Sequence, residues 1–280
     1  MMTWNLWWRF GPWAARQPAI AAVLAEEAPD IVLLQEVWAD KETGEDQAQL
    51  LAAPAGYFFA RSRRAARSGE RVGEPYGFGN AVLSRWPIAF EETLVLPGAD
   101  GEPSHRSAII AEIDHPGGPL LVTATHLDWR YDHSELRQTQ LDALLDELRR
   151  TKADRSIIRP LVIGADLNAV PSSDEVRRLT GLAVPYTGGG GRGPVFTDCW
   201  AAMTDDPGHT WTRDNPHAVD AVWPRRRLDY LLVSWPRPKP TDNPIAAHLA
   251  GHQPVGGVVA SDHYAVVVDL DDRPPQEIDE

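Results

Sequence analysis

Two kinds of apolar pattern alternate along the chain, and together they predict both strands and helices. A continuous apolar run such as Asp30–Gln35 is typical of a strand that is buried on both faces. Apolar positions at helical spacing predict helices over Gln17–Glu27 and Ser134–Arg150, with Ser134 as the N-cap of the second. Further strands are predicted over Thr3–Trp7, Gly77–Leu83, Phe90–Leu96, Ser107–Ile113, Leu120–Thr125, Leu161–Ala165, Leu228–Ser234 and Tyr264–Leu270.

This mixture of helices with several hairpin-like pairs of strands predicts an α/β fold. Two β-sheets are expected to pack face to face, with the helices on the outside. No internal repeat and no proline-rich linker divides the 280 residues, so one large domain over residues 1–270 is expected. The last ten residues, Asp271–Glu280, are acidic and contain proline, and they are expected to form a disordered tail.

The composition bears on where the protein works. No run approaches the ~20 apolar residues that a membrane-spanning helix needs. The first residues lack the basic and then apolar segments of a signal peptide, and the single Cys199 suits a reducing compartment and a place in the core. The cytoplasm is therefore the expected location.

Six short polar motifs stand at the ends of the predicted strands. Carboxylates and amides gathered at strand ends are hard oxygen ligands, which suit Mg²⁺ or Mn²⁺. Two histidines in the same set titrate near neutral pH. Such a set predicts metal-assisted hydrolysis, with a phosphate ester as the favoured target. The motifs are Thr3-Trp4-Asn5, Gln35-Glu36-Val37, Thr125-His126-Leu127-Asp128, Gly164-Ala165-Asp166-Leu167-Asn168, Arg227-Leu228-Asp229-Tyr230 and Ser261-Asp262-His263.

Taken together and in this order, the motifs resemble those of the endonuclease/exonuclease/phosphatase superfamily, over residues 3 to 270. That superfamily includes deoxyribonuclease I, abasic-site endonucleases, neutral sphingomyelinases, inositol-polyphosphate 5-phosphatases and deadenylases. The resemblance implies a four-layered α/β sandwich with two mixed, mostly antiparallel sheets. It also implies a site in a cleft at one edge of the two sheets.

The resemblance also implies roles for individual residues. Glu36 would be the main ligand of Mg²⁺ or Mn²⁺, with Asn5 and Asp262 as further ligands. Asp166 would orient or deprotonate the attacking water, and Asn168 would steady the phosphate. His263, paired with Asp229, would contact the scissile phosphate. The remaining roles fall on His126, as a phosphate ligand or an acid toward the leaving oxygen, and on Arg106 and Asn80, near the phosphate.

The net charge of −13 bears on the choice of substrate. A protein that grips long nucleic acid usually neutralises phosphates with a basic surface. Here the only basic clusters are Arg61–Arg71 and Arg225–Arg227. A small or lipid phosphodiester is therefore favoured over DNA or RNA, and a nuclease is the alternative within the same superfamily. A catalytically silent binding module is disfavoured, since all six motifs are present.

Four tryptophans adjoin the motifs. For each of them, packing in the core is a simpler interpretation than a wall of the substrate pocket. They are Trp7, Trp8, Trp129 and Trp211.

Overall fold

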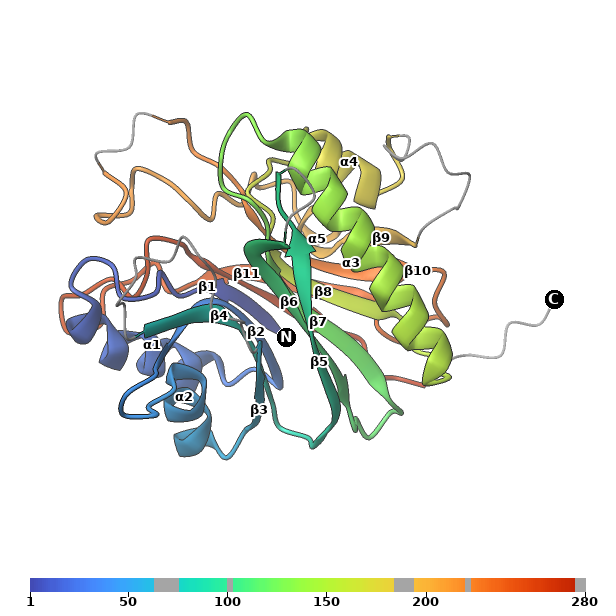
Figure 1. Ribbon diagram of the computed structural model, residues 1–280, viewed down its shortest axis with the longest axis horizontal. Coiled ribbons are helices and arrows are strands. Elements are labelled where there is room, and N and C mark those ends of the chain that lie inside the picture. The colour runs from blue at the N-terminus through green and yellow to red at the C-terminus, as the bar shows by residue number, and fades with distance from the viewer. Residues whose placement is uncertain (63–75, 100–102, 184–193, 220–222, 275–280) are drawn as a thin grey trace.

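Two six-stranded sheets packed against each other form the centre of the protein (Figure 1). The computed structural model describes residues 1–62, 76–99, 103–183, 194–219 and 223–274. In spatial order, the first sheet contains β11 (Pro244–Ala250), β12 (Ala265–Leu270), β1 (Met2–Asn5), β2 (Ile31–Asp40), β4 (Tyr76–Ser84) and β3 (Phe58–Arg61). The second contains β5 (Ile88–Pro97), β6 (Pro103–Ile113), β7 (Leu120–His126), β8 (Leu161–Asp166), β10 (Asp229–Trp235) and β9 (Val195–Asp198).

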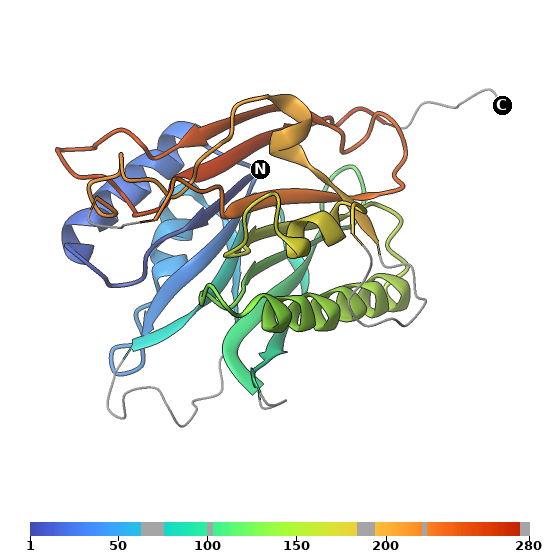
Figure 2. The same cartoon turned by 90° about the horizontal axis from the view of Figure 1, so that it is seen from above.

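The three longer helices cover the outer faces of the two sheets (Figure 2). On the first sheet lie α1 (Trp13–Glu27) and α2 (Gln47–Ala55), and on the second lies α3 (Ser134–Asp154). Two shorter helices, α4 (Asp174–Leu179) and α5 (Cys199–Met203), complete the set in the described ranges. Two strand pairs are parallel, β1 with β2 and β7 with β8, and each is joined by a crossover helix, as a parallel pair requires.

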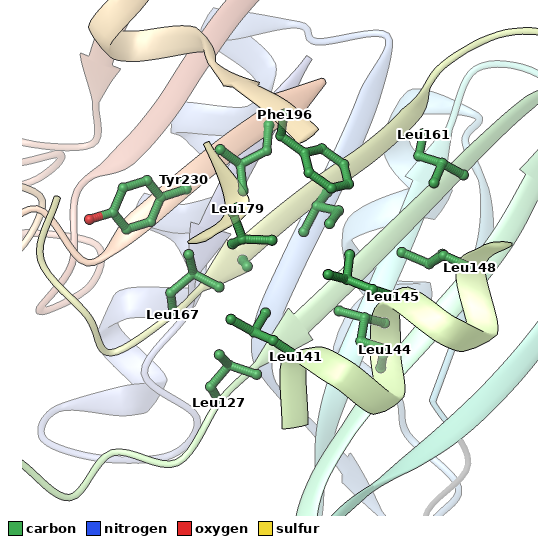
Figure 3. Packing of buried hydrophobic residues seen from close by; sticks show 14 of the residues in the cluster. Leu127, Leu141, Leu144, Leu145, Leu148, Leu161, Leu167, Leu179, Phe196 and Tyr230 are labelled. Atoms are coloured by element: carbon green, nitrogen blue, oxygen red, sulfur yellow. The ribbon is translucent and has the colours of Figure 1, made fainter. Parts of the chain in front are cut away.

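Alternation of side chains along the strands produces the layers. Leu33 faces the other sheet, while its neighbour Leu34 faces α1 and α2. In the second sheet Val122 lies between the sheets, whereas Leu121 belongs to the cluster under α3. Figure 3 shows the α3 leucines of that cluster, Leu141, Leu144, Leu145 and Leu148, with Leu161 of β8. Successive residues of a strand point to opposite faces, so each continuous apolar run fills two cores at once.

The predicted fold class is confirmed, since the two mixed sheets have mostly antiparallel pairs and helices outside. Every predicted strand and both predicted helices are present, with somewhat different ends. The elements that the sequence did not predict are short or lie near the sheet edges: α2, β3, α4, β9, α5 and β11. Cys199 is buried, as expected.

Two local predictions were wrong. The N-cap of α3 is His133 rather than Ser134, and its side chain makes no capping hydrogen bond. The chain also stays packed beyond residue 270. Asp271 is buried and exchanges backbone hydrogen bonds with Asp242 and Asn243, and Arg273 accepts a hydrogen bond from Thr241. Residues 275–280 of the predicted tail lie outside the described ranges.

No helix in the described ranges is long and apolar enough to span a lipid bilayer. The division into one domain and a tail otherwise stays a prediction.

Candidate active site

The register of the strands brings three of the predicted site residues side by side. His126 at the end of β7 is the direct partner of Asp166 at the end of β8. Asp166 is in turn the partner of Asp229, the first residue of the antiparallel strand β10. Parallel strands end at the same edge of a sheet and an antiparallel neighbour begins there. The second sheet therefore carries these three side chains in one row.

The first sheet contributes its residues at the same edge. Asn5 ends β1 and pairs with Gln35 of the parallel strand β2. Glu36 follows, and Asp262 and His263 lie in the bend just before β12. Gly164 lets the sheets approach here, because a Cβ at this position would lie 2.5 Å from the side chain of Leu33.

Asp166 is the centre of the site. Its Oδ2 accepts a hydrogen bond from Nδ2 of Asn5 at 2.9 Å and lies 3.4 Å from Nε2 of His126 and 3.9 Å from Nε2 of His263. Burial alone would raise the pKa of Asp166, but the two imidazoles and the Asn5 bond outweigh it, and the pKa lies below its usual value. This carboxylate is therefore ionised at neutral pH.

His263 and Asp229 form a buried ion pair. Nδ1 of His263 donates to Oδ2 of Asp229 at 2.8 Å. Burial alone would lower the pKa of His263, but the carboxylates of Asp229 and Asp262 raise it well above its usual value. Burial raises the pKa of Asp229 to about 6, so near neutral pH the proton resides on the imidazole. The predicted pairing of these two residues is confirmed.

His126 has the opposite protonation state. Burial and then the guanidinium of Arg106 lower its pKa well below the usual value, so its imidazole is neutral near pH 7. Arg106 also lies 5.9 Å from the ring of Phe78, which neighbours the His126 ring. Asn80 donates from Nδ2 to the backbone oxygen of Ser107, which ties β4 to β6 across the two sheets beside the site.

The sequence suggested that Glu36 ends its strand, but in the structure it does not. β2 continues to Asp40, and a β-bulge between Leu34 and Val37 contains Glu36 in the left-handed region at φ 54°. A bulge re-aims one side chain without ending the strand, and a non-glycine residue in this region is uncommon. The bulge thus explains how a carboxylate in mid-strand reaches the edge.

Glu36 and Asp262 form a pair of carboxylates. The side chain of Glu36 is only 14% exposed, and its Oε2 has no hydrogen-bond partner among the described residues. Burial and then Asp262 raise the pKa of Glu36 to about 7, and burial raises that of Asp262. Two part-buried carboxylates, of which Asp262 raises the pKa of Glu36, suit a divalent cation between them.

A second cluster is a poorer metal site. Asp166, Asp229 and His263 each offer one ligand atom within 4.8 Å of the others. However, Nδ1 of His263 is committed to Asp229 and the imidazole is protonated, and a protonated imidazole does not bind metal. The donor chemistry therefore favours Glu36 and Asp262.

Asn168 follows β8 in a turn rather than in extended backbone. Its φ is 50°, and its backbone N–H donates to Oδ1 of Asp166 at 2.9 Å. Its amide nitrogen donates to the backbone oxygen of Leu127. The turn brings Asn168 back toward the end of β7 and keeps it beside Asp166.

Sequence reasoning missed Arg16, which holds the loop after β1. Its fully buried guanidinium donates to the backbone oxygens of Leu6, Trp7, Trp8, Phe10 and Ala260. Burial lowers its pKa to about 10, against the opposing effect of Asp262. The signal was present, since Arg16 precedes Ala19, Ile20 and Val23 on the buried stripe of α1, but the predicted helix began after it.

Further polar residues fix the segment that carries Asp262 and His263. The Ser261 hydroxyl donates to the backbone oxygen of Asn5 at 2.7 Å, and Asn215 donates to that of Ser261. The Trp4 indole donates to the backbone oxygen of His263. These bonds hold the two ends of the chain together at the site.

The basic clusters and tryptophans were less well predicted. Arg61 pairs with Asp46, and Arg63–Arg71 lie outside the described ranges. Arg225 pairs with Asp214, and Arg227 with the buried Asp198. None of the four tryptophans beside the motifs is fully buried, and Trp129 is 57% exposed, so core packing was wrong for it.

Comparison with known proteins agrees with this arrangement. The profile of the Endonuclease/Exonuclease/phosphatase family matches residues 2–263. Tyrosyl-DNA phosphodiesterase 2 of Xenopus laevis is 24% identical over 92% of this chain, which spans 62% of the length of that relative.

Two solved structures show the same fold. The endonuclease/exonuclease/phosphatase from Beutenbergia cavernae is 27% identical, with a TM-score of 0.69 over 96% of this chain and 70% of that one. TDP2 of D. rerio in complex with a single strand DNA product is 19% identical, with a TM-score of 0.71 over 95% of this chain and 96% of that one.

Proposed function

The chain belongs to the Endonuclease/Exonuclease/phosphatase family, and from this membership we propose that it hydrolyses phosphodiesters with the help of Mg²⁺ or Mn²⁺. The observation that carries the proposal is the contact of ionised Asp166 with two imidazoles of opposite protonation state. A relative is a tyrosyl-DNA phosphodiesterase, which supports a diester as the target.

The cation would be held by Glu36 and Asp262, because burial raises the pKa of both carboxyl groups and a positive charge beside them would favour their ionised forms. Asn5, with its neutral amide at the same edge, is proposed as a further ligand. When bound, a divalent cation offsets the charge that develops on the phosphate oxygens.

The remaining residues would move protons and position the phosphate. Asp166, which is ionised at neutral pH, orients the attacking water and helps to remove its proton. His263, kept protonated by Asp229, donates from Nε2 to the phosphate and can supply a proton to the leaving oxygen. His126 is neutral and is better suited to a hydrogen bond with the phosphate than to acid catalysis. Asn168, Arg106 and Asn80 are proposed to position the phosphate.

The substrate class follows less directly. The preference for small or lipid diesters rested on the net charge of −13, and the relatives do not support it. A nucleic acid or nucleotide substrate is the second candidate. In the 225–227 cluster, Arg225 and Arg227 pair with carboxylates. Of these three arginines, only Arg226 therefore favours a nucleic acid or nucleotide substrate.

A substrate panel tests the proposal. The dialysed protein should hydrolyse bis(p-nitrophenyl) phosphate when Mg²⁺ or Mn²⁺ is added, and should act much less on p-nitrophenyl phosphate. EDTA should abolish the activity. Full activity in EDTA would contradict the metal dependence. No hydrolysis of any diester, single- or double-stranded DNA, RNA or sphingomyelin would contradict the proposed reaction and favour a silent binding module.

A further inference from the structure

An exposed cluster of two aromatic rings and one arginine lies beside the site. The rings of Tyr131 and Trp223 stack with centroids 4.0 Å apart and planes inclined by 31°. The guanidinium carbon of Arg226 lies 4.3 Å from the Tyr131 centroid and 5.1 Å from that of Trp223. Although they stack, the two residues remain 45% and 44% exposed. We call Tyr131, Trp223 and Arg226 the aromatic platform.

The platform connects two loops that both leave the sheet at the site. Tyr131 follows β7, which ends in His126, and Arg226 precedes β10, which begins at Asp229. Arg226 exchanges both backbone hydrogen bonds with Trp211, at 3.0 and 2.9 Å, so its place beside β10 is fixed. His126 and Asp229 flank Asp166 in the sheet register. The platform therefore spans the same edge as the reacting groups.

Packing alone does not explain this cluster. Large aromatic rings that stabilise a fold are mostly buried, whereas these rings keep much of their surface in water. An exposed ring pair with a guanidinium on it is suited to bind a planar, polarisable group by stacking and cation–π attraction. The nearby Trp129, with Arg130 5.4 Å from its ring centroid, extends the same chemistry along the β7 loop.

We propose that the aromatic platform stacks a nucleobase of the substrate and so selects diesters that carry an unpaired base. This inference rests on the proposed phosphodiesterase function. A phosphate held at Asp166 would have the platform within the loops that leave β7 and β10 at this edge, so one of its substituents could reach the rings. With a net charge of −13, the protein gains less from contacts with many phosphates than from stacking, which does not depend on charge. A paired base in a duplex has no free face, so single strands or nucleotide diesters are favoured.

Two diesters with the same leaving group test the proposal. Thymidine 5′-(p-nitrophenyl) phosphate carries a base, and methyl p-nitrophenyl phosphate does not. Trp223→Ala and Tyr131→Ala should each lower kcat/KM for the thymidine ester by about tenfold or more, as loss of one stacking contact implies. Both variants should leave kcat/KM for the methyl ester unchanged. Trp223→Phe should restore most of the lost activity.

Trp235→Ala is the matched control. Trp235 is a 49% exposed tryptophan with a lysine on its ring, but it lies at the opposite end of β10 from Asp229. It should change neither substrate. Equal losses on both esters, or no loss on the thymidine ester, would overturn the stacking site. If the unmodified protein hydrolyses neither ester with metal, the proposed function itself fails.

A second experiment distinguishes a nucleic acid strand from a small nucleotide diester as the source of the base. Single-stranded and duplex oligonucleotides of the same sequence are compared in the unmodified protein and in Trp223→Ala. Loss on the single strand as well as on the thymidine ester identifies a nucleic acid strand as the source, and loss confined to the thymidine ester identifies a small nucleotide diester. Faster cleavage of the duplex, unaffected by Trp223→Ala, would overturn the proposal.

Discussion

Asn5 donates a hydrogen bond from its amide nitrogen to Oδ2 of Asp166 at 2.9 Å, and this bond joins the two sheets inside the site. On its other side, Oδ1 of Asn5 accepts the backbone N–H of Trp7. A carboxylate can only accept and an N–H can only donate, so the orientation of the amide is determined at both ends. Asn5 thus holds the carboxylate on which the proposed chemistry depends.

Replacement of Asn5 tests this link. Asn5→Asp should lower turnover more than Asn5→Ala, because a second carboxylate beside Asp166 raises the pKa of Asp166 by like-charge repulsion. A loss of about tenfold or more is expected near neutral pH. The pH profile of kcat should shift to higher pH in both variants, because both lose the hydrogen bond that lowers the pKa of Asp166, and it should shift further in Asn5→Asp. An unchanged profile in Asn5→Ala would show that the hydrogen bond does not control Asp166.

Metal affinity should depend on pH through Glu36. Its pKa of about 7 means that the metal-free protein keeps this proton in mild acid, and the metal must displace it. The apparent affinity for Mn²⁺ should therefore rise about tenfold per pH unit up to pH ~7 and then level off. Calorimetric titrations at several pH values measure it. Glu36→Gln should weaken binding and slow turnover by orders of magnitude, and the exposed Glu26→Gln should do neither.

The same shift has a consequence for metal-free stability. The native state holds a proton on Glu36 that the unfolded state has already released above its usual pKa of 4.5. This group therefore lowers the free energy of unfolding as the pH rises from about 4.5 to about 7. An equal metal affinity at pH 6 and pH 8 would contradict the raised pKa of Glu36. It would therefore contradict both the expected pH dependence of metal binding and the expected pH dependence of stability.

The two histidines should respond differently. His263→Ala and His126→Ala should each lower turnover by about two to four orders of magnitude with little change in melting temperature. Asp229→Asn removes the charge that keeps His263 protonated, so its activity should fall as the pH rises through the neutral range, while the unmodified protein keeps its activity. His248→Ala, at an exposed position, is the control. Normal turnover in either site variant would exclude that histidine.

Arg16 should matter for folding more than any surface arginine. Arg16→Met leaves five backbone oxygens without their donor and should lower the free energy of unfolding by about 3 kcal/mol or more. Arg149→Met, on the exposed face of α3, should change it by less than about 0.5 kcal/mol. Denaturant unfolding compares the two. Equal stability in both variants would show that the loop after β1 does not need Arg16.

Much of the fold could be predicted because strands buried on both faces are continuous apolar runs. Asp30–Gln35, Leu120–Thr125 and Leu161–Ala165 all have this pattern and all form central strands. The edge strands β3 and β11 and the short helix α4 were not predicted, since their half-exposed residues lack a clear period. The bulge at Glu36 could not be predicted from the sequence, because a β-bulge needs only one extra residue.

The sequence by itself determined the family and the residue types that meet at the candidate site. The order of the six motifs identified the family, and the residue types offered candidate oxygen ligands, a candidate water-orienting carboxylate and two imidazoles. Residue types fix which hydrogen bonds and protonation states are available wherever the chain folds.

Only the tertiary structure decided how those groups differ from one another. His126 and His263 are the same residue type, but burial and then Arg106 lower the pKa of His126, while Asp229 raises that of His263 against burial, so one imidazole is neutral and one is charged. Likewise Tyr131 and Trp223 meet only because β7 and β10 flank β8. A pKa and a stacking contact depend on which distant segments lie within a few ångströms, and that is settled by packing rather than by neighbours in the chain.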